Sequence, residues 1–391
     1  MKLNTVIVKV SNFFNYVVLY LILKVIAFKK VTMKERTLLL IRLDAIGDYI
    51  LFRNFIESIK KSTQYRNYKI TLCGNKIWKE LSEIFDQEYV DDFIWIDRKK
   101  FYNEVSYKFN LLRQIHERGF EVTIEATYSR EILYGDAIVR AANSRTSIGS
   151  IGSKEKHVVW KRKLLTDRIY SQLISLSTDS LFEFYTNKEF FSAIVNEQLN
   201  IVKPELSVNG IQKSEKIRNK YVVIFPGTNE ISRMWPSANF KEIADYLWQS
   251  YSYDIVLSGS KNESYLFDLI GNNFERRFVN LFGNTLTELT RLIADAQLVI
   301  SNDTSAVHIS AAVNTPVICI SSGQYFGRFQ PYPQEVFAKA FSIYPPAVMN
   351  ELHNHEHLSQ KYRYGSDRNI NEVTPDAVKK VVQKILGTRN K

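Results

Sequence analysis

The hydrophobic pattern of the chain changes at residue 38. From there, short uninterrupted apolar runs alternate with segments of helical spacing, as expected of buried parallel strands connected by helices. The first run, Leu38–Leu43, ends in a turn and is followed by a helical pattern over Tyr49–Lys60. Further strand candidates are Lys69–Cys73, Asp92–Ile96 and Glu121–Glu125. This alternation predicts a doubly wound α/β sheet.

A second series of the same kind fills the C-terminal half. Its strand candidates are Tyr221–Phe225, Asp254–Leu257, Leu298–Ile300 and Val317–Ile320, and its helix candidates are Asn239–Gln249, Leu286–Ala294, Ala306–Val313 and Thr374–Leu386. Residues 166–220 between the two series are mixed and polar, with Pro204 and Gly210 as breakers. We therefore predict two Rossmann-like domains, 37–205 and 206–391, after a separate segment 1–36. A chain of 391 residues is long enough for two hydrophobic cores.

The N-terminal segment contains a strongly apolar stretch, Phe13–Phe28, interrupted by Asn15 and Lys24. A membrane-spanning helix needs about 20 apolar residues, so this stretch is too short and imperfect to span. No small-residue cleavage site follows it, which argues against a signal peptide. Its aromatic content and the basic residues after it are typical of a helix in the membrane interface. A helix packed against the first domain explains the stretch equally well.

The net charge of +11 favours anionic partners such as nucleic acid, phosphorylated sugars or an acidic membrane face. The basic residues are dispersed and no RNA-binding signature or zinc finger is present, so we predict no nucleic-acid partner. Cys73 and Cys319 lie far apart in apolar, strand-like surroundings, which predicts buried thiols and fits a reducing cytoplasm.

Three segments that follow strand candidates carry the chemistry, because open α/β sheets bind ligands at the carboxyl ends of their strands. The first runs from Asp44 to Asp48. We expect Gly47 to let the backbone turn tightly, so that Asp48 lies at a helix start facing the crevice. Its carboxylate can take a proton from an attacking hydroxyl there. It can equally serve only as a helix cap.

The second segment brings Pro226 and Gly227, then Thr228 and Asn229, then Arg233 after a strand. Backbone N–H groups, a hydroxyl and a guanidinium together suit a diphosphate. Taken alone, the segment is also compatible with a loop whose tryptophan is only a packing residue.

The third segment turns through Ser301–Ser305 into a helix of small residues. The helix start directs N–H groups and a positive dipole end at any anion placed there. Asp303 either caps this helix or contacts a sugar. His308 lies one turn in and is a second candidate for the sugar, although a packed core histidine is the commoner case.

Metal chemistry is not predicted. His353, His355 and His357 would share a face in an extended segment, but a solvated loop explains them better. The chain has no P-loop, no Gly-x-Ser-x-Gly and no complete Gly-x-Gly-x-x-Gly. We therefore expect neither a metal nor a bound cofactor.

In this order and spacing, the three segments resemble the ADP-heptose:lipopolysaccharide heptosyltransferases, glycosyltransferase family 9, over roughly Leu38–Leu386. The resemblance implies a GT-B fold, with two Rossmann-like domains facing a central cleft. It also implies inverting, metal-independent transfer of a sugar from a nucleotide sugar, such as ADP-heptose, to lipopolysaccharide or another cell-envelope glycan.

The resemblance implies roles for particular residues. Asp48 matches the catalytic base, and Asp303 matches the acidic residue near the sugar. The donor diphosphate would be bound by Thr228, Asn229, Arg233, Thr304, Ser305 and Ala306, and the nucleoside by Glu263, Asn284 and Thr285.

Some positions depart from the family pattern. Asp44 stands where the family usually has a small hydroxyl residue, and Ser305 replaces a frequent glycine. The segment with Tyr325 and Arg328 is similar to a divergent branch, which leaves the sugar open.

Two other functions remain compatible with the sequence. One is a different GT-B enzyme, such as another hexosyltransferase or a nucleotide-sugar epimerase. The other is a non-catalytic nucleotide-sugar-binding protein of envelope assembly. All three place the protein in the cytoplasm, with a peripheral position on the inner membrane as an option for the N-terminal stretch.

Overall fold

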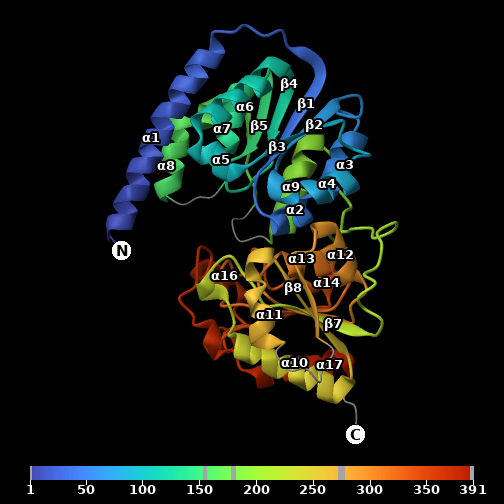
Figure 1. The fold of residues 1–391 in the computed structure, drawn as a ribbon. Coiled ribbons are helices and arrows are strands. Elements are labelled where there is room, and N and C mark those ends of the chain that lie inside the picture. Colours follow the sequence, from blue (N-terminus) through green and yellow to red (C-terminus); the bar gives the residue numbers. More distant parts are fainter. Residues whose placement is uncertain (1, 153–155, 178–181, 272–277, 388–391) are drawn as a thin grey trace. The chain divides into compact units, whose positions relative to one another are not determined.

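The chain folds into two compact units (Figure 1). The computed structural model describes residues 2–152, 156–177, 182–271 and 278–387. Unit 1 comprises residues 1–179 and 186–200, and unit 2 comprises residues 180–185 and 201–391. We predicted a boundary after residue 205 and a separate segment 1–36. The chain instead divides after residue 200, the short stretch 180–185 groups with unit 2, and the N-terminal segment is part of unit 1.

Unit 1 is built on a six-stranded parallel sheet in the order β3-β2-β1-β4-β5-β6. Its strands are β1 Lys34–Arg42, β2 Lys69–Asn75, β3 Asp92–Ile96, β4 Phe120–Glu125, β5 Thr146–Ser150 and β6 Gln172–Ile174. The central strand β1 is paired on both sides and its apolar run is fully buried, which explains why it lacks a polar face.

Helices cover both faces of this sheet. They are α1 Lys2–Ala27, α2 Ile46–Phe52, α3 Asn54–Lys61, α4 Lys79–Phe85, α5 Arg98–Asn103, α6 Val105–Arg118, α7 Gly135–Ala142, α8 Lys156–Leu165 and α9 Glu183–Val195, whose first turn is grouped with unit 2. Leu39 and Ile41 of β1 share one core with α1, α6 and α7. Phe55, from α3, stacks instead on Phe191 of α9, and Phe52, from α2, packs against the same ring at an interplanar angle of 42°.

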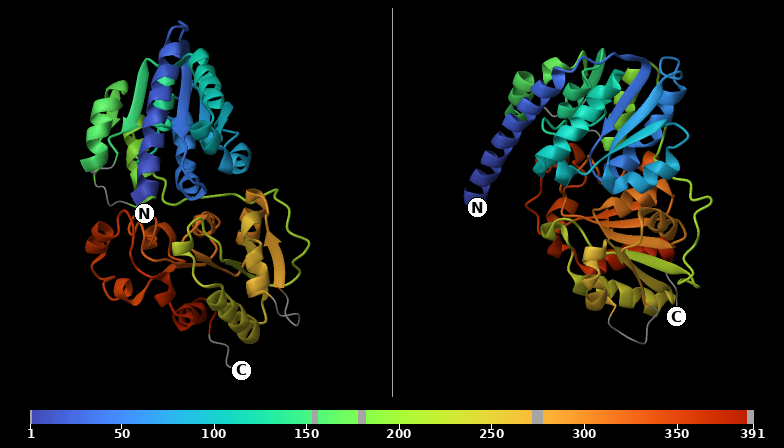
Figure 2. Two further views of the ribbon diagram at one scale, coloured as in Figure 1. Left: turned by 60° about the vertical axis from the view of Figure 1, so that its left-hand side comes forward. Right: turned by 45° about the horizontal axis from the view of Figure 1, so that its top comes forward.

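The N-terminal stretch forms the long helix α1, which packs on unit 1 (Figures 1 and 2). Leu19, Ile22, Leu23 and Ile26 are buried in the same core as α6 and α7. Of the two explanations for the stretch, packing against the first unit is therefore observed. Within the described residues, no helix has both the length and the apolar character needed to cross a membrane.

Unit 2 repeats the architecture with the strand order β12-β11-β10-β7-β8-β9, again all parallel. Its strands are β7 Tyr221–Phe225, β8 Asp254–Gly259, β9 Phe278–Phe282, β10 Leu298–Asn302, β11 Val317–Ile320 and β12 Ala340–Ile343. Its helices are α10 Ser237–Tyr251, α11 Tyr265–Ile270, α12 Leu286–Ala294, α13 Ser305–Ala312, α14 Gln334–Phe337, α15 Pro346–Met349, α16 His355–Lys361 and α17 Pro375–Leu386. One core joins β7 and β10 to α10, α11 and α17.

Both sheets therefore confirm the prediction of two Rossmann-like halves. In each, the chain order reverses between two neighbouring central strands, β1 and β4 in unit 1 and β7 and β10 in unit 2. The crevice beyond the carboxyl ends of such a strand pair is where this architecture binds ligands. The predicted site segments follow β1, β7 and β10. Both predicted thiols, Cys73 and Cys319, are buried in strands.

Candidate active site

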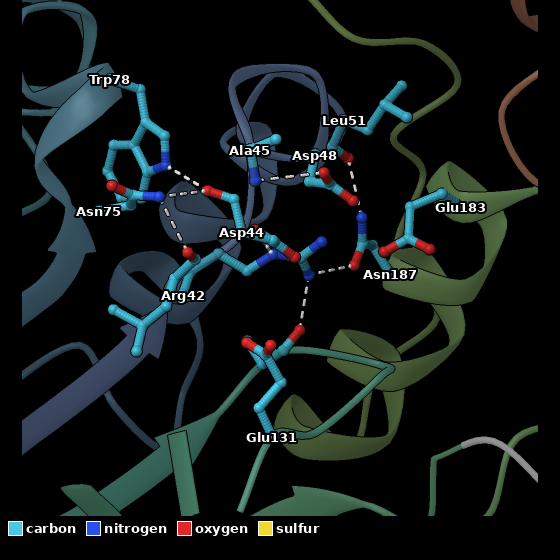
Figure 3. A network of polar contacts seen from close by, with 12 residues as sticks. Arg42, Asp44, Ala45, Asp48, Leu51, Asn75, Trp78, Glu131, Glu183 and Asn187 are labelled. Carbon is cyan, nitrogen blue, oxygen red and sulfur yellow. Dashed lines mark hydrogen bonds and ion pairs between the residues drawn. The ribbon is translucent and has the colours of Figure 1, made fainter. Parts of the chain in front are cut away.

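The turn after β1 is held by a buried network within unit 1 (Figure 3). The Arg42 side chain is fully buried at the end of the strand. Its Nε donates to Asp44 Oδ1 at 2.9 Å, and one terminal nitrogen donates to the carbonyl of Ala126 at 2.6 Å and to Asn187 Oδ1 at 2.9 Å. Asp44, which departs from the family pattern, is thus a carboxylate oriented by a buried arginine. An ion pair of this kind is stable only with such added hydrogen bonds.

Asp48 is the third residue of α2 and is half-buried. Its Oδ2 accepts a hydrogen bond from the N–H of Ala45 at 3.3 Å (Figure 3). Asp48 is therefore not the N-cap that we considered, which is Ala45, but its contact with that residue belongs to a capping box and holds the carboxylate at the carboxyl end of β1.

Gly47 does not make the tight turn that we predicted. It lies inside α2 as the second helical residue and is buried. The turn lies before it, at Asp44 and Ala45, where the extended φ and ψ of −79° and 177° at Ala45 are accessible to any residue.

Several side chains of unit 1 hold this turn through its carbonyl groups. Asn75 donates to the carbonyls of Leu43 and Asp44, both at 3.1 Å, and Trp78 Nε1 donates to Asp44 at 3.1 Å. Trp78 stacks on Tyr49 of α2 with 4.6 Å between ring centroids. Bonds from strand β2 and its following turn thus fix the backbone that carries Asp48.

In unit 2, the two charged residues predicted for the donor lie together. Arg233, in the short helical turn Ile231–Arg233, donates to the Asp303 carbonyl at 2.7 Å and lies 3.4 Å from its carboxylate. Burial raises the pKa of the Asp303 carboxyl above its ordinary value, and Arg233 opposes that shift. Asp303 is not the helix cap that we considered, because Thr304 occupies that position. Asp303 instead orients the guanidinium.

Asn302 joins the loops after β7 and β10. The side chain is fully buried, accepts from the N–H of Trp235 at 3.0 Å and donates to the carbonyl of Pro226 at 2.6 Å. Trp235 itself is buried, and its indole N–H donates to the carbonyl of Val373 at 2.8 Å. It is therefore a packing residue, as the alternative interpretation of this segment predicted. Thr228 and Asn229 lie between these anchors, half-buried and exposed respectively.

Helix α13 starts as predicted, directly after β10. Thr304 caps it by accepting from the N–H of Ala306, and its hydroxyl lies 3.0 Å from that of Ser301. His308 is buried one turn in, with Nδ1 2.6 Å from the Tyr332 hydroxyl. Burial lowers the pKa of His308 to about 4, so the ring is neutral at neutral pH. Its packing is that of a core histidine.

Glu263 lies against the loop after β7. It accepts from the N–H and hydroxyl of Ser260, both at 2.7 Å, and a Cβ added at Gly227 would come within 2.1 Å of its carboxylate. The absence of a side chain at Gly227 is therefore what allows this approach. The structure thus places the loop after β7, which we predicted to bind the diphosphate, next to the acid predicted for the ribose.

Asn284 and Thr285, predicted for the nucleoside, lie at the start of helix α12. Thr285 caps α12, accepting from the N–H of Glu288 while Glu288 accepts from the N–H of Thr285. Asn284 lines a cavity of about 610 Å³ formed with the loop 211–220 and α12. Of the predicted site residues, only Asn284 is among the lining residues, so none of the residues predicted for the diphosphate lines this cavity.

The three alternating histidines are exposed, and in the described part of the chain none belongs to a cluster able to hold a metal ion. His355 and His357 lie in helix α16 rather than in a loop. His355 packs on Phe326 with 5.0 Å between ring centroids, and His357 Nε2 lies 3.7 Å from Glu351.

Sequence reasoning missed Arg42, Asn187, Asn302 and Tyr332. A signal existed for Arg42, since a charged residue inside an otherwise apolar strand run is costly unless paired. The others depend on partners remote in sequence: 145 residues separate Asn187 from Arg42, and 67 separate Asn302 from Trp235.

Comparison with known proteins shows the family of the chain. Residues 108–349 match the model of glycosyltransferase family 9 (heptosyltransferase). Lipopolysaccharide heptosyltransferase 3 of Escherichia coli is 24% identical over 291 residues, which cover 70% of this chain and 80% of that protein. Its counterpart in strain K12 is 24% identical over 246 residues, 60% of this chain and 68% of that protein.

Two solved structures share the fold over most of both chains. E. coli heptosyltransferase WaaC with ADP-2-deoxy-2-fluoro heptose has a TM-score of 0.67 at 14% identity, covering 89% of this chain and 99% of that one. E. coli ADP-heptose lps heptosyltransferase II has a TM-score of 0.64 at 16% identity, covering 90% and 98%. These similarities confirm the predicted GT-B fold.

Proposed function

Because the chain belongs to glycosyltransferase family 9, we propose that it transfers a heptose or related sugar from a nucleotide sugar to lipopolysaccharide or another cell-envelope glycan. The observation that carries the proposal is the placement of the site residues. A half-buried carboxylate follows the switch-point strand of one sheet, and an arginine–aspartate pair with a helix start follows the two switch-point strands of the other.

The proposed reaction is a single displacement with inversion at the anomeric carbon. Asp48 accepts the proton of an acceptor hydroxyl as the oxygen forms its bond to that carbon. The bond from the anomeric carbon to the diphosphate oxygen breaks, and the nucleoside diphosphate leaves with the electron pair. The contact from Ala45 to Oδ2 supports this role, because it orients Asp48.

Arg233 and the first N–H groups of α13 stabilise the charge that develops on the leaving diphosphate. Thr228 and Asn229 add polar contacts, and Ser305 and Ala306 contribute backbone groups at the helix start. Asp303 positions Arg233 through the observed pair and faces the sugar. Glu263 contacts the ribose beside Gly227, with Asn284 and Thr285 toward the base.

No metal or cofactor takes part in this mechanism, because a fixed guanidinium and a helix dipole supply the positive charge. The reaction would take place on the cytoplasmic side, where nucleotide sugars and the growing glycan meet. Turnover measured with and without EDTA tests the metal-independent step. A rate that EDTA abolishes and Mg²⁺ restores would contradict it.

Asp48→Asn tests the base. The amide oxygen can still accept from the N–H of Ala45, so the substitution keeps the capping contact and removes only the proton acceptor. We expect kcat to fall by about 10²–10⁴ with unchanged affinity for the nucleotide and an unchanged Tm. Transfer is measured with ADP-heptose and other nucleotide sugars on lipopolysaccharide acceptors of truncated core.

Asp376→Asn is the matched control, since it makes the same change in the first turn of α17, where the exposed carboxylate lies 3.3 Å from half-buried Lys379. This variant should keep full activity. Near-normal turnover in folded Asp48→Asn would show that another group takes the proton.

A further inference from the structure

The outer face of α1 is an apolar surface that no described residue of unit 1 covers. Phe13, Phe14, Val17, Leu21 and Phe28 are all exposed, with 70% of Phe13 and 86% of Phe28 accessible to solvent. Their spacing of three, four and seven residues places the helical members on one side of the helix. Figure 2 shows α1 along the outside of unit 1.

The inner face of the same helix explains Asn15, one of the two polar residues that interrupt the stretch. Asn15 is buried and accepts from Lys108 Nζ at 2.7 Å, and Asn12 accepts from the Tyr102 hydroxyl at 2.7 Å. Both partners belong to α5 and α6 of unit 1. The asparagines therefore face the protein, and the outer face is more apolar than the sequence suggests.

The C-terminal end of α1 is attached to unit 1. His116 Nε2 lies 2.8 Å from the carbonyl of Lys29, and the N–H of Lys34 donates to the carbonyl of Gly119 at 2.8 Å. Together with the buried strip Leu19–Ile26, these bonds hold the helix along the domain. A helix bound along one side in this way can present its outer face to a surface, but it cannot insert across a bilayer without leaving its core contacts.

The charge of the segment that forms α1 has a single sign, although Lys29 pairs with Glu117 of α6 at 2.8 Å. Residues 1–34 contain six lysines and no aspartate or glutamate. Lys24 lies on the outer face, 5.6 Å above the Tyr20 ring, and Lys29 and Lys30 follow Phe28. A second copy docked on this face would bring like charges together, whereas anionic lipid headgroups would neutralise them.

We propose that the outer face of α1 docks unit 1 on an anionic membrane surface, with the helix parallel to the bilayer. Phe13, Phe14, Leu21 and Phe28 would enter the boundary between headgroups and acyl chains, while the lysines contact lipid phosphates. The inference rests on α1 alone and does not depend on the proposed reaction.

Vesicle flotation of the full-length protein tests this. We expect binding to vesicles of phosphatidylcholine and phosphatidylglycerol in equal amounts, and weak binding to phosphatidylcholine alone. Substituting Phe13, Phe14 and Leu21 by serine should lower the partition coefficient by roughly tenfold or more, because each change removes apolar side-chain burial. Substituting Lys24, Lys29 and Lys30 by glutamine should lower it by about fivefold per lysine, and only on anionic vesicles.

A matched control is Val202→Ser with Leu269→Ser, which removes apolar side chains of unit 2 that are 63% and 52% exposed, compared with 56% for Leu21. It should bind vesicles like the parent. Unchanged circular dichroism and Tm would show that every variant folds, and transfer to a water-soluble acceptor fragment should be unchanged.

Any of three results would overturn the proposal. The first is a parent protein that does not float with anionic vesicles, and the second is an α1 variant that floats as well as the parent. The third is a lipid-free dimer in light scattering that the α1 substitutions convert to monomer, which would assign this face to a second copy.

Discussion

Asn302 offers a sharp test of how the loops after β7 and β10 are joined. Replacing it by alanine removes the acceptor for the N–H of Trp235 and the donor to the carbonyl of Pro226. All three residues are buried, so water cannot replace either bond without rearrangement. The substitution therefore leaves two buried backbone groups without partners.

The expected cost follows from these two groups. Each unpaired buried polar group costs about 1–3 kcal/mol, and the two together should lower the free energy of unfolding of unit 2 by roughly 2–6 kcal/mol. For a unit of this size, 1 kcal/mol corresponds to about 2–4 °C in Tm, so the transition should fall by about 4–24 °C. Because Arg233 lies in the loop that Asn302 anchors, nucleotide affinity should fall as well.

Differential scanning calorimetry is the suitable assay, because two units can unfold in separate steps and only one transition should move. Asn280→Ala is the control, since this exposed asparagine accepts only from the N–H of Phe282 at 3.1 Å near the end of β9. It should shift Tm by less than about 2 °C. A shift of Asn302→Ala no larger than that of the control would refute the argument that this side chain holds the two loops together.

Two further predictions concern unit 2. The folded pKa of His308 is about 4, below the ordinary 6.5, so its contribution to stability is fully present above pH 6.5 and is lost as the pH falls toward 4. Between pH 7 and pH 5 this should remove roughly 2 kcal/mol, and calorimetry of His308→Asn should show a pH dependence shallower by that amount. Equal slopes would mean that folding does not lower the pKa of the ring. In Gly227→Ala, the new Cβ would come 2.1 Å from the Glu263 carboxylate, so this side chain must move. Affinity for a nucleoside diphosphate, measured by calorimetric titration, should then fall about tenfold. Adding Glu263→Ala should not weaken binding further, whereas additive losses would show that Gly227→Ala does not act by displacing Glu263.

Much of the fold could be predicted because its signal is local. The apolar runs that became β1, β7, β10 and β11 can be satisfied only by burial on both faces, and the helical spacing between them requires crossover connections. Strand β5, with the sequence TSIGS, and the three-residue β6 were missed because neither carries such a run. Their pairing with β4 and with each other is what makes them strands.

The positions of the candidate site residues could also be predicted from local signals. Asp48, Arg233 and Asp303 each follow a strand end, and the rule that ligands bind there selected them without any knowledge of contacts. What each side chain does was not readable from its neighbours in sequence. Asp303 was considered as a cap or a sugar contact, and its observed partner is Arg233, 70 residues away.

The N-terminal helix likewise separates what the sequence determines from what the tertiary structure decides. The sequence by itself determined that Phe13–Phe28 is an apolar helix with a basic flank, since composition and spacing are properties of the segment alone. Only the tertiary structure decided which side of that helix is buried, because Asn15 needs Lys108 and the core needs Leu19 and Ile22. Periodicity specifies that a helix has faces, whereas the partner that covers one of them lies elsewhere in the chain and is selected by packing and hydrogen bonding.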